Sequence, residues 1–252
     1  MKVFLILSFQ VDGIQFIEAA MCKIRRTTPA KSDGVKILPR SLLLAAVSSI
    51  GFIGLTAVPE SQGAVFNGGS ITLIDANPIP TSPTLASSYP STINVSGLQT
   101  IPISGNNVTL TLNNFSTTGF ADDLDMLLVG PTGANLIIWS DVGAPTSTAV
   151  GPLTITLSDA AASFLPVGAA LSGGTFKPTN NGADNFPSPA PSGPYGNPGP
   201  AGTATFASIF NNTNPNGSWS LYILDDTWDG NGQTMTIPSW NLTINAPVIP
   251  EP

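Results

Sequence analysis

The most constraining feature of the chain is residues 121–134, which read Ala-Asp-Asp-Leu-Asp-Met-Leu-Leu-Val-Gly-Pro-Thr-Gly-Ala. Leu124, Met126 and Leu128 stand at every second position, which is the period of a β-strand. The Gly-Pro-Thr-Gly that follows has the residues of a tight turn. The stretch therefore predicts an acidic loop, a strand and a turn, in that order.

Short alternating runs of this kind recur, bounded by Gly, Pro, Asn or Ser, and they predict strands at 71–73, 93–95, 108–112, 124–128, 135–140, 153–157, 219–223, 235–237 and 240–244. Residues 159–163 fit one helical turn capped by Asp159, and 203–210 fit a short strand or helical turn. Residues 178–202 are rich in Pro, Gly, Asn and Ser and predict a long loop. Many short strands without long helices predict an all-β fold, an antiparallel β-sandwich or jelly roll.

The residue inventory excludes several kinds of chemistry. The chain has no histidine, so it cannot contain a Ser-His-Asp triad, a Cys-His pair or a histidine metal site. Its one cysteine, Cys22, cannot form a disulfide framework. From Ala64 onward eleven acidic residues stand against one basic residue, Lys177, a net charge of about −10. Such a body repels nucleic acid and anionic lipid, and it suits divalent cations.

The N-terminal part has the order of an export signal. Seven of the eight basic residues precede Ser41, residues 41–58 carry no charge, and small residues follow at 61–64. We therefore expect a leader over 1–64 with its apolar region at 41–58, and an exported protein; a retained membrane anchor is the alternative. The first 20 residues do not fit a signal peptide, so we predict that the protein starts at Met21.

Two motifs carry a resemblance to a known family. Residues 123–133 resemble the Asp-Leu-x-φ-x-Leu-x-x-Pro-x-Gly motif of the P domain (P/Homo B domain), where φ is an apolar residue. Residues 216–221 resemble that family's Asn-Gly-x-Trp-x-Leu, and 240–244 its closing Trp-Asn-Leu-Thr-Ile. The resemblance implies that residues 65–246 form an antiparallel jelly-roll β-sandwich of the galactose-binding-like type.

The P domain is best known following the subtilisin-like catalytic domain of proprotein convertases and some bacterial serine proteases, where it supports folding and stability. This chain has no room for a catalytic domain and no histidine to serve one. The resemblance therefore implies a stand-alone, non-catalytic module. The threonine usual after the Pro-x-Gly turn is Ala134 here.

The last residues, 247–252, end in Pro-Glu-Pro and resemble the opening of a PEP-CTERM sorting signal of exported bacterial proteins. The membrane-spanning stretch and basic tail of that signal do not follow. The resemblance implies a truncated C-terminus and sorting to the envelope or extracellular matrix; the alternative is a chance match of three residues.

Two acidic clusters supply the candidate site, and their members are Asp122, Asp123, Asp125, Asp225, Asp226 and Asp229. Carboxylates in loops at strand ends are the hard oxygen ligands that Ca²⁺ prefers, so one interpretation is a calcium site shared by both clusters. The alternative has Asp123 and Asp225 capping turns while Asp226 and Asp229 are solvated.

Trp228, in the second acidic loop, is the candidate contact for a sugar or protein; the alternative has it packed over its own sheet. A glycosidase with paired carboxylates is disfavoured because Glu is nearly absent. Three tryptophans also fall on predicted core positions, namely Trp139, Trp219 and Trp240.

These observations favour an exported, non-catalytic, P-domain-like module with a structural or interaction role at the cell surface, outer envelope or matrix, stabilised by calcium. The expected partner is a protein or polysaccharide at the cell surface. Membrane contact is expected only through the leader or a C-terminal anchor. One alternative is an accessory domain for a subtilisin-like serine endopeptidase supplied by another chain; a second is a carbohydrate-binding module.

Overall fold

The computed structural model describes residues 2–11, 14–23, 63–75, 83–182, 184–227 and 232–250. The chain forms two compact units, Met1–Ala57 and Val58–Pro252. In the first unit, β1 (Lys2–Val11) pairs antiparallel with β2 (Ile14–Lys23). The expected apolar leader segment, 41–58, lies outside the described residues. Within the described part, no helix is both long and apolar enough to span a membrane.

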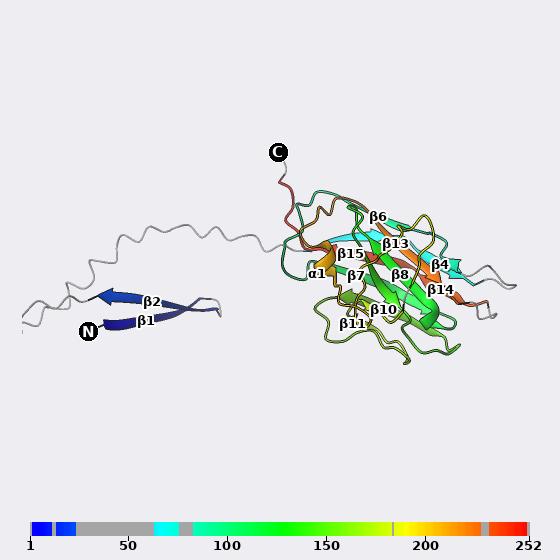
Figure 1. Cartoon of the computed structure of the whole chain (residues 1–252), viewed down its shortest axis with the longest axis horizontal. Helices are drawn as coiled ribbons and strands as arrows, with labels where there is room; N and C mark the ends of the chain where they lie inside the picture. Colours follow the sequence, from blue (N-terminus) through cyan, green and yellow to red (C-terminus); the bar gives the residue numbers. More distant parts are fainter. Residues whose placement is uncertain are drawn as a thin grey trace, which may run out of the picture. The chain divides into compact units, whose positions relative to one another are not determined.

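The second unit is mostly β, with two mixed sheets packed together as in a β-sandwich (Figure 1). The seven-stranded sheet contains β3 (Ala64–Gly68), β4 (Ile71–Ile74), β7 (Val108–Thr117), β10 (Val150–Ser158), β11 (Gly174–Phe176), β14 (Thr234–Ile237) and β15 (Ser239–Ile244). The six-stranded sheet contains β5 (Thr84–Leu85), β6 (Ser91–Val95), β8 (Leu124–Val129), β9 (Asn135–Ser140), β12 (Thr179–Asn180) and β13 (Gly217–Asp225). The described residues of this unit also form two short helices, η2 (Ala121–Asp123) and α1 (Phe206–Phe210). All nine predicted strands are therefore confirmed.

The expectation of purely antiparallel sheets is wrong at two edges. β11 pairs parallel with β10, and β12 pairs parallel with β9. A parallel pair needs a long crossover between its strands. The irregular residues between β10 and β11, and the longer path from β9 through β10 to β12, supply that length.

The core lies between the two sheets and is centred on large aromatic side chains. Trp139, Trp219 and Trp240 are fully buried, which confirms their predicted positions. The indole N–H of Trp240, in β15, donates to Ser91 Oγ, in β6, at 3.0 Å. Because these two strands belong to different sheets, this bond ties the layers together inside the core.

Strand β7 runs five residues further than its alternating pattern indicates. Leu112 pairs with Ile155, but Phe115 pairs with Leu153, so two residues of β7 oppose one residue of β10. Asn114 occupies this bulge with φ 55°, a left-handed conformation that asparagine tolerates. The bulge returns Phe115 to the core and shifts the alternation by one residue, which explains why the period ends at Leu112.

The predicted helical turn over 159–163 is wrong, since these residues form a turn and bends. Asp159 is nevertheless a helix cap, because its carboxylate accepts from the backbone N–H groups of Phe206 at 3.0 Å and Ala207 at 2.8 Å. These are first-turn donors of α1, which have no partner within the helix. Of the two predictions for residues 203–210, a short strand or a helical turn, the helical turn is confirmed by α1.

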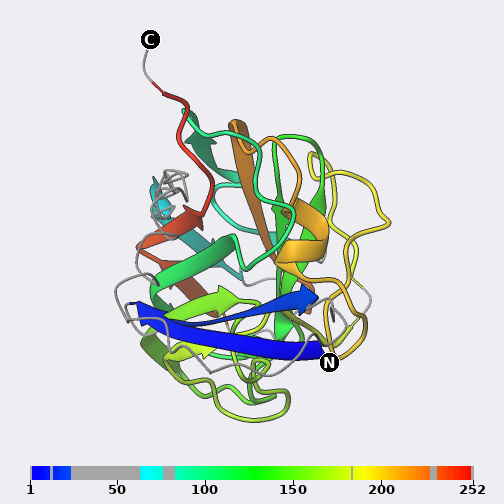
Figure 2. The same ribbon diagram turned by 90° about the vertical axis from the view of Figure 1, so that its left-hand side faces the viewer.

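The long loop covers the outer face of the six-stranded sheet (Figure 2, yellow). Phe186 of the loop packs with Leu127, Ile137 and Leu224 of the sheet. Tyrosine hydroxyls donate to loop carbonyls, from Tyr89 to Pro187 at 3.1 Å, from Tyr222 to Pro189 at 3.2 Å and from Tyr195 to Pro191 at 2.9 Å. The loop is therefore part of the folded unit and forms a second, smaller apolar cluster.

Candidate cation-binding site

Four aspartates converge at one end of the six-stranded sheet. Asp125 lies at the start of β8, Asp141 directly follows β9, and Asp226 directly follows β13. β8 lies between β9 and β13 and is antiparallel to both, so its start is beside their ends. The long loop adds Asp184 to the same place.

The carboxylates lie close enough to share one ion. One carboxylate oxygen each from Asp125, Asp184 and Asp226 lies within 4.8 Å of the other two. A Cβ atom at Gly182 would lie 1.9 Å from Asp141 Oδ2 and 3.2 Å from Asp184 Oδ1. Because Gly182 has no side chain, the carboxylates of Asp141 and Asp184 can both lie close to its backbone.

Ser140 supports this group from within the sheet. It is fully buried, and its hydroxyl donates to Asp141 Oδ2 at 3.0 Å. Burial raises the pKa of Asp125 and of Asp184, and hydrogen bonding with Ser140 offsets only a part of that rise. One neutral hydroxyl has a single proton to donate, so it cannot neutralise several carboxylates.

Burial makes the cluster electrostatically costly. Asp125 is 2% exposed, and loss of hydration followed by the charges of Asp184, Asp226 and Asp141 raises its pKa to about 9. Loss of hydration is also the main cause that raises the pKa of Asp184 and of Asp226, and the charge of Asp141 adds to both. Like charges this close favour a bound proton or a bound cation.

An orphaned oxygen provides a separate indication of a ligand. Asp184 Oδ2 is buried and has no hydrogen-bond partner among the described residues. A buried carboxylate oxygen that is left unsatisfied costs free energy, and a coordinated cation would remove that cost. A pocket of about 280 Å³ borders the cluster at Asp184 and is also lined by Asn180, Asn185 and Asn197.

The other predicted site residues take different positions. Asp225 is buried, and its Oδ1 accepts from the backbone N–H of Thr227 at 3.1 Å, which confirms the alternative that it caps a turn. Its other oxygen, Oδ2, accepts from the side-chain amide of Gln233. Asp122 and Asp123 form η2, and the Asp123 carbonyl accepts from Asp226 N–H at 3.1 Å, so the two acidic loops do meet. Asp229 and Trp228 lie outside the described residues.

Of the six predicted aspartates, the structure thus brings Asp125 and Asp226 together and adds two that were missed. Asp141 carried a usable signal, because it directly follows the strand predicted at 135–140. Asp184 carried none, since it stands in a loop whose path depends on the folded sheet.

No protein-family model, curated protein or solved structure matches this chain. The resemblance to the P domain therefore rests on the motifs themselves. In the fold the two main motifs lie side by side, since β13 pairs with β8 and Leu221 stands opposite Leu128.

Proposed function

We propose that the chain is an exported, non-catalytic β-sandwich module of P-domain type, with a jelly-roll topology, that binds Ca²⁺ and acts at the cell surface or in the matrix. The observation that carries the calcium site is the convergence of Asp125, Asp184 and Asp226 within 4.8 Å, with Asp125 only 2% exposed. The motif resemblance supports the topology and the lack of catalysis.

The ligand set suits calcium better than other cations. It offers only oxygen atoms, and Ca²⁺ takes 6–8 oxygen ligands at roughly 2.3–2.6 Å in flexible geometry, completed by backbone carbonyls or water. Mg²⁺ demands a stricter octahedron and keeps most of its waters, while transition metals favour histidine or cysteine. Neither histidine nor cysteine occurs after residue 22.

A calcium ion here would have a structural effect. Asp184 belongs to the loop that covers the sheet, while Asp125 and Asp226 belong to the sheet strands or directly follow them. One ion held by all three would clamp the loop to the sheet and offset the repulsion among the carboxylates. The proposed export of the chain is consistent with this role, because extracellular modules use calcium sites with a Kd of about 10⁻⁴–10⁻³ M.

The test is thermal unfolding of the full chain in EDTA and in excess calcium, for the parent and for Asp125→Asn and Asp184→Asn. A ligand at about 100 times its Kd stabilises the folded state by about 2.7 kcal/mol. For a domain of this size that raises Tm by roughly 5–10 °C. We expect this shift in the parent and little or none in the two variants.

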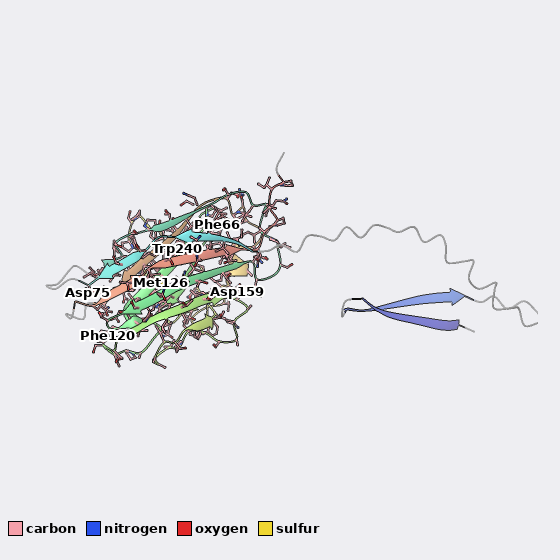
Figure 3. The ribbon with its side chains drawn as sticks, turned by 180° about the vertical axis from the view of Figure 1, so that it is seen from behind. Phe66, Asp75, Phe120, Met126, Asp159 and Trp240 are labelled. Atoms are coloured by element: carbon pink, nitrogen blue, oxygen red, sulfur yellow. The ribbon has the colours of Figure 1, made fainter. Side chains whose placement is uncertain are left out.

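Asp159→Asn is the matched control. It makes the same charge change. Asp159 lies toward the opposite end of the unit from Asp75 and from Phe120 (Figure 3). Phe120 precedes η2, and η2 is bonded to the cluster because the Asp123 carbonyl accepts from Asp226 N–H. The control should keep the full calcium shift. A parent without a shift, or an equal shift in all four proteins, would reject the site.

A further inference from the structure

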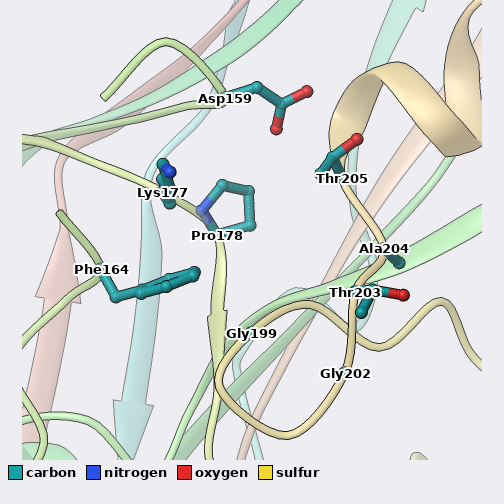
Figure 4. A pocket seen from close by; sticks show the side chains of 9 residues that line it. All are labelled: Asp159, Phe164, Lys177, Pro178, Gly199, Gly202, Thr203, Ala204 and Thr205. Atoms are coloured by element: carbon teal, nitrogen blue, oxygen red, sulfur yellow. The ribbon is translucent and has the colours of Figure 1, made fainter. Parts of the chain in front are cut away.

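A second pocket, of about 290 Å³, lies beside α1 and combines apolar walls with opposite charges (Figure 4). Its walls are Phe164, Pro178 and Ala204, and its polar side chains include Asp159, Lys177 and Thr203. None of these residues belongs to the aspartate cluster, so this pocket is separate from the cation site.

Lys177 gives the pocket a property found nowhere else in the C-terminal 212 residues. It is the only lysine or arginine after Arg40, in a body with a net charge of about −10. Its ammonium lies 5.5 Å from the centroid of the Phe164 ring, which places the charge at the pocket wall. An anionic ligand is therefore attracted here and repelled by the surrounding surface.

Phe164 supplies a partly open aromatic surface. Its side chain is 42% exposed, which is unusual for phenylalanine in a unit whose core aromatics are fully buried. The ring lies against the backbone of Gly199, where a Cβ atom would approach Phe164 Cζ to 2.5 Å. Gly199 therefore holds one edge of the ring in place while much of the rest faces the pocket and solvent.

The remaining polar groups can accept hydrogen bonds. The two oxygens of Asp159 accept from two backbone N–H groups of α1, and an ionised carboxylate has further lone pairs. Thr203 is exposed, and its hydroxyl both donates and accepts. The pocket thus presents a flat apolar surface, one cation and several acceptors.

We propose that this pocket binds a sugar carrying a single carboxylate, such as the uronate at the end of a glycan. The apolar face of the pyranose ring would pack on Phe164, its carboxylate would pair with Lys177, and its hydroxyls would donate to Asp159 and Thr203. A single negative charge matches one lysine, whereas a dense polyanion would meet the acidic surface. Several hydroxyl donors suit these acceptors better than a peptide C-terminus, which brings one N–H beside its carboxylate.

Binding of methyl glucuronide and methyl glucoside to the full chain, by calorimetry or by NMR titration, tests the proposal. We expect the glucuronide to bind about tenfold more tightly, because only it forms a charge-assisted pair with Lys177. Lys177→Met should reduce the glucuronide to the level of the glucoside, and Lys177→Arg should keep the preference. Phe164→Ala should weaken both sugars, with its unfolding midpoint showing that it remains folded.

Lys177→Arg is the matched control, since it keeps the positive charge at the same position and should leave the affinity for both sugars close to that of the parent. All titrations are repeated in EDTA, so that loss of the cation site is distinguished from loss of this one. No binding, equal binding of both sugars, or a preference that survives Lys177→Met would overturn the proposal. The proposal would also be overturned if an N-acetyl dipeptide with a free carboxylate bound in a way that depends on Lys177 while neither sugar did.

Discussion

Among single residues, Asp125 holds the least favourable charge in the described part of the candidate site. It is buried with the charges of Asp184, Asp226 and Asp141 near it, and only hydrogen bonding with the neutral hydroxyl of Ser140 opposes their effect on its pKa. Without a cation, the stable state of this carboxyl near neutral pH is the protonated one. Its protonation therefore links folding stability to pH and, in our proposal, to calcium.

The pH dependence of calcium-free stability follows from this residue. Burial raises the pKa of Asp125 from 3.8 to about 9, so the folded state keeps a proton that the unfolded chain releases above about pH 4. Stability in EDTA should be highest below the unfolded pKa and should fall as pH rises toward about 9. The raised pKa values of Asp184 and Asp226 act in the same direction.

Unfolding midpoints in EDTA across this pH window measure the effect. Asp125→Asn should flatten the slope, since an amide does not titrate, and saturating calcium should reduce it in the parent. A parent whose stability rises between about pH 5 and pH 8 in EDTA would contradict the assignment.

At the element scale, the helix α1 depends on a residue remote in sequence. Its first-turn N–H groups donate to Asp159 and, through Ser208 N–H at 3.0 Å, to Thr205. Its buried side packs Phe210 against Trp219, with ring centroids 4.9 Å apart. The cap and this core contact together determine where the short helix lies.

Asp159→Ala should therefore lower stability by about 1–2 kcal/mol, the usual cost of losing a helix N-cap. Asp159→Asn keeps an acceptor and should cost less. Urea unfolding of both variants checks the order, and equal costs would show that the carboxylate bonds to Phe206 and Ala207 contribute little.

At the scale of the folded unit, the sandwich is joined to its long loop by an apolar cluster, by tyrosine hydroxyls and, in our proposal, by one ion. Phe186 and Tyr195 contact edge to face at 5.4 Å, and Tyr89 and Tyr222 at 5.0 Å. The middle of the loop is held by the first of these contacts and by the hydroxyls of Tyr89 and Tyr222, which donate to Pro187 and Pro189, whereas Asp184 would hold its start.

Hydrogen exchange in residues 184–197 should thus slow when calcium is added, because local opening of the loop would release the ion. Asp184→Asn should remove the effect. Residues 203–210, which include α1, serve as the internal control and should exchange alike in calcium and EDTA. Slower exchange over both segments would indicate a general stabilisation in place of a clamp at Asp184.

Local sequence was enough to predict nine of the strands, the turn after β8 and the tryptophan core, and it offered the cap at Asp225 as one of two alternatives. These features depend on the alternation or hydrogen bonding of residues close in the chain. Local sequence could not predict the bulge at Asn114, the capping of α1 by Asp159 or the entry of Asp184 into the acidic cluster. Each of these needs partners far apart in sequence, and they meet only after β7 has paired with β10, and β8 with β9 and β13. Composition indicated an affinity for cations, but only the folded sheet determined which carboxylates lie within reach of one ion.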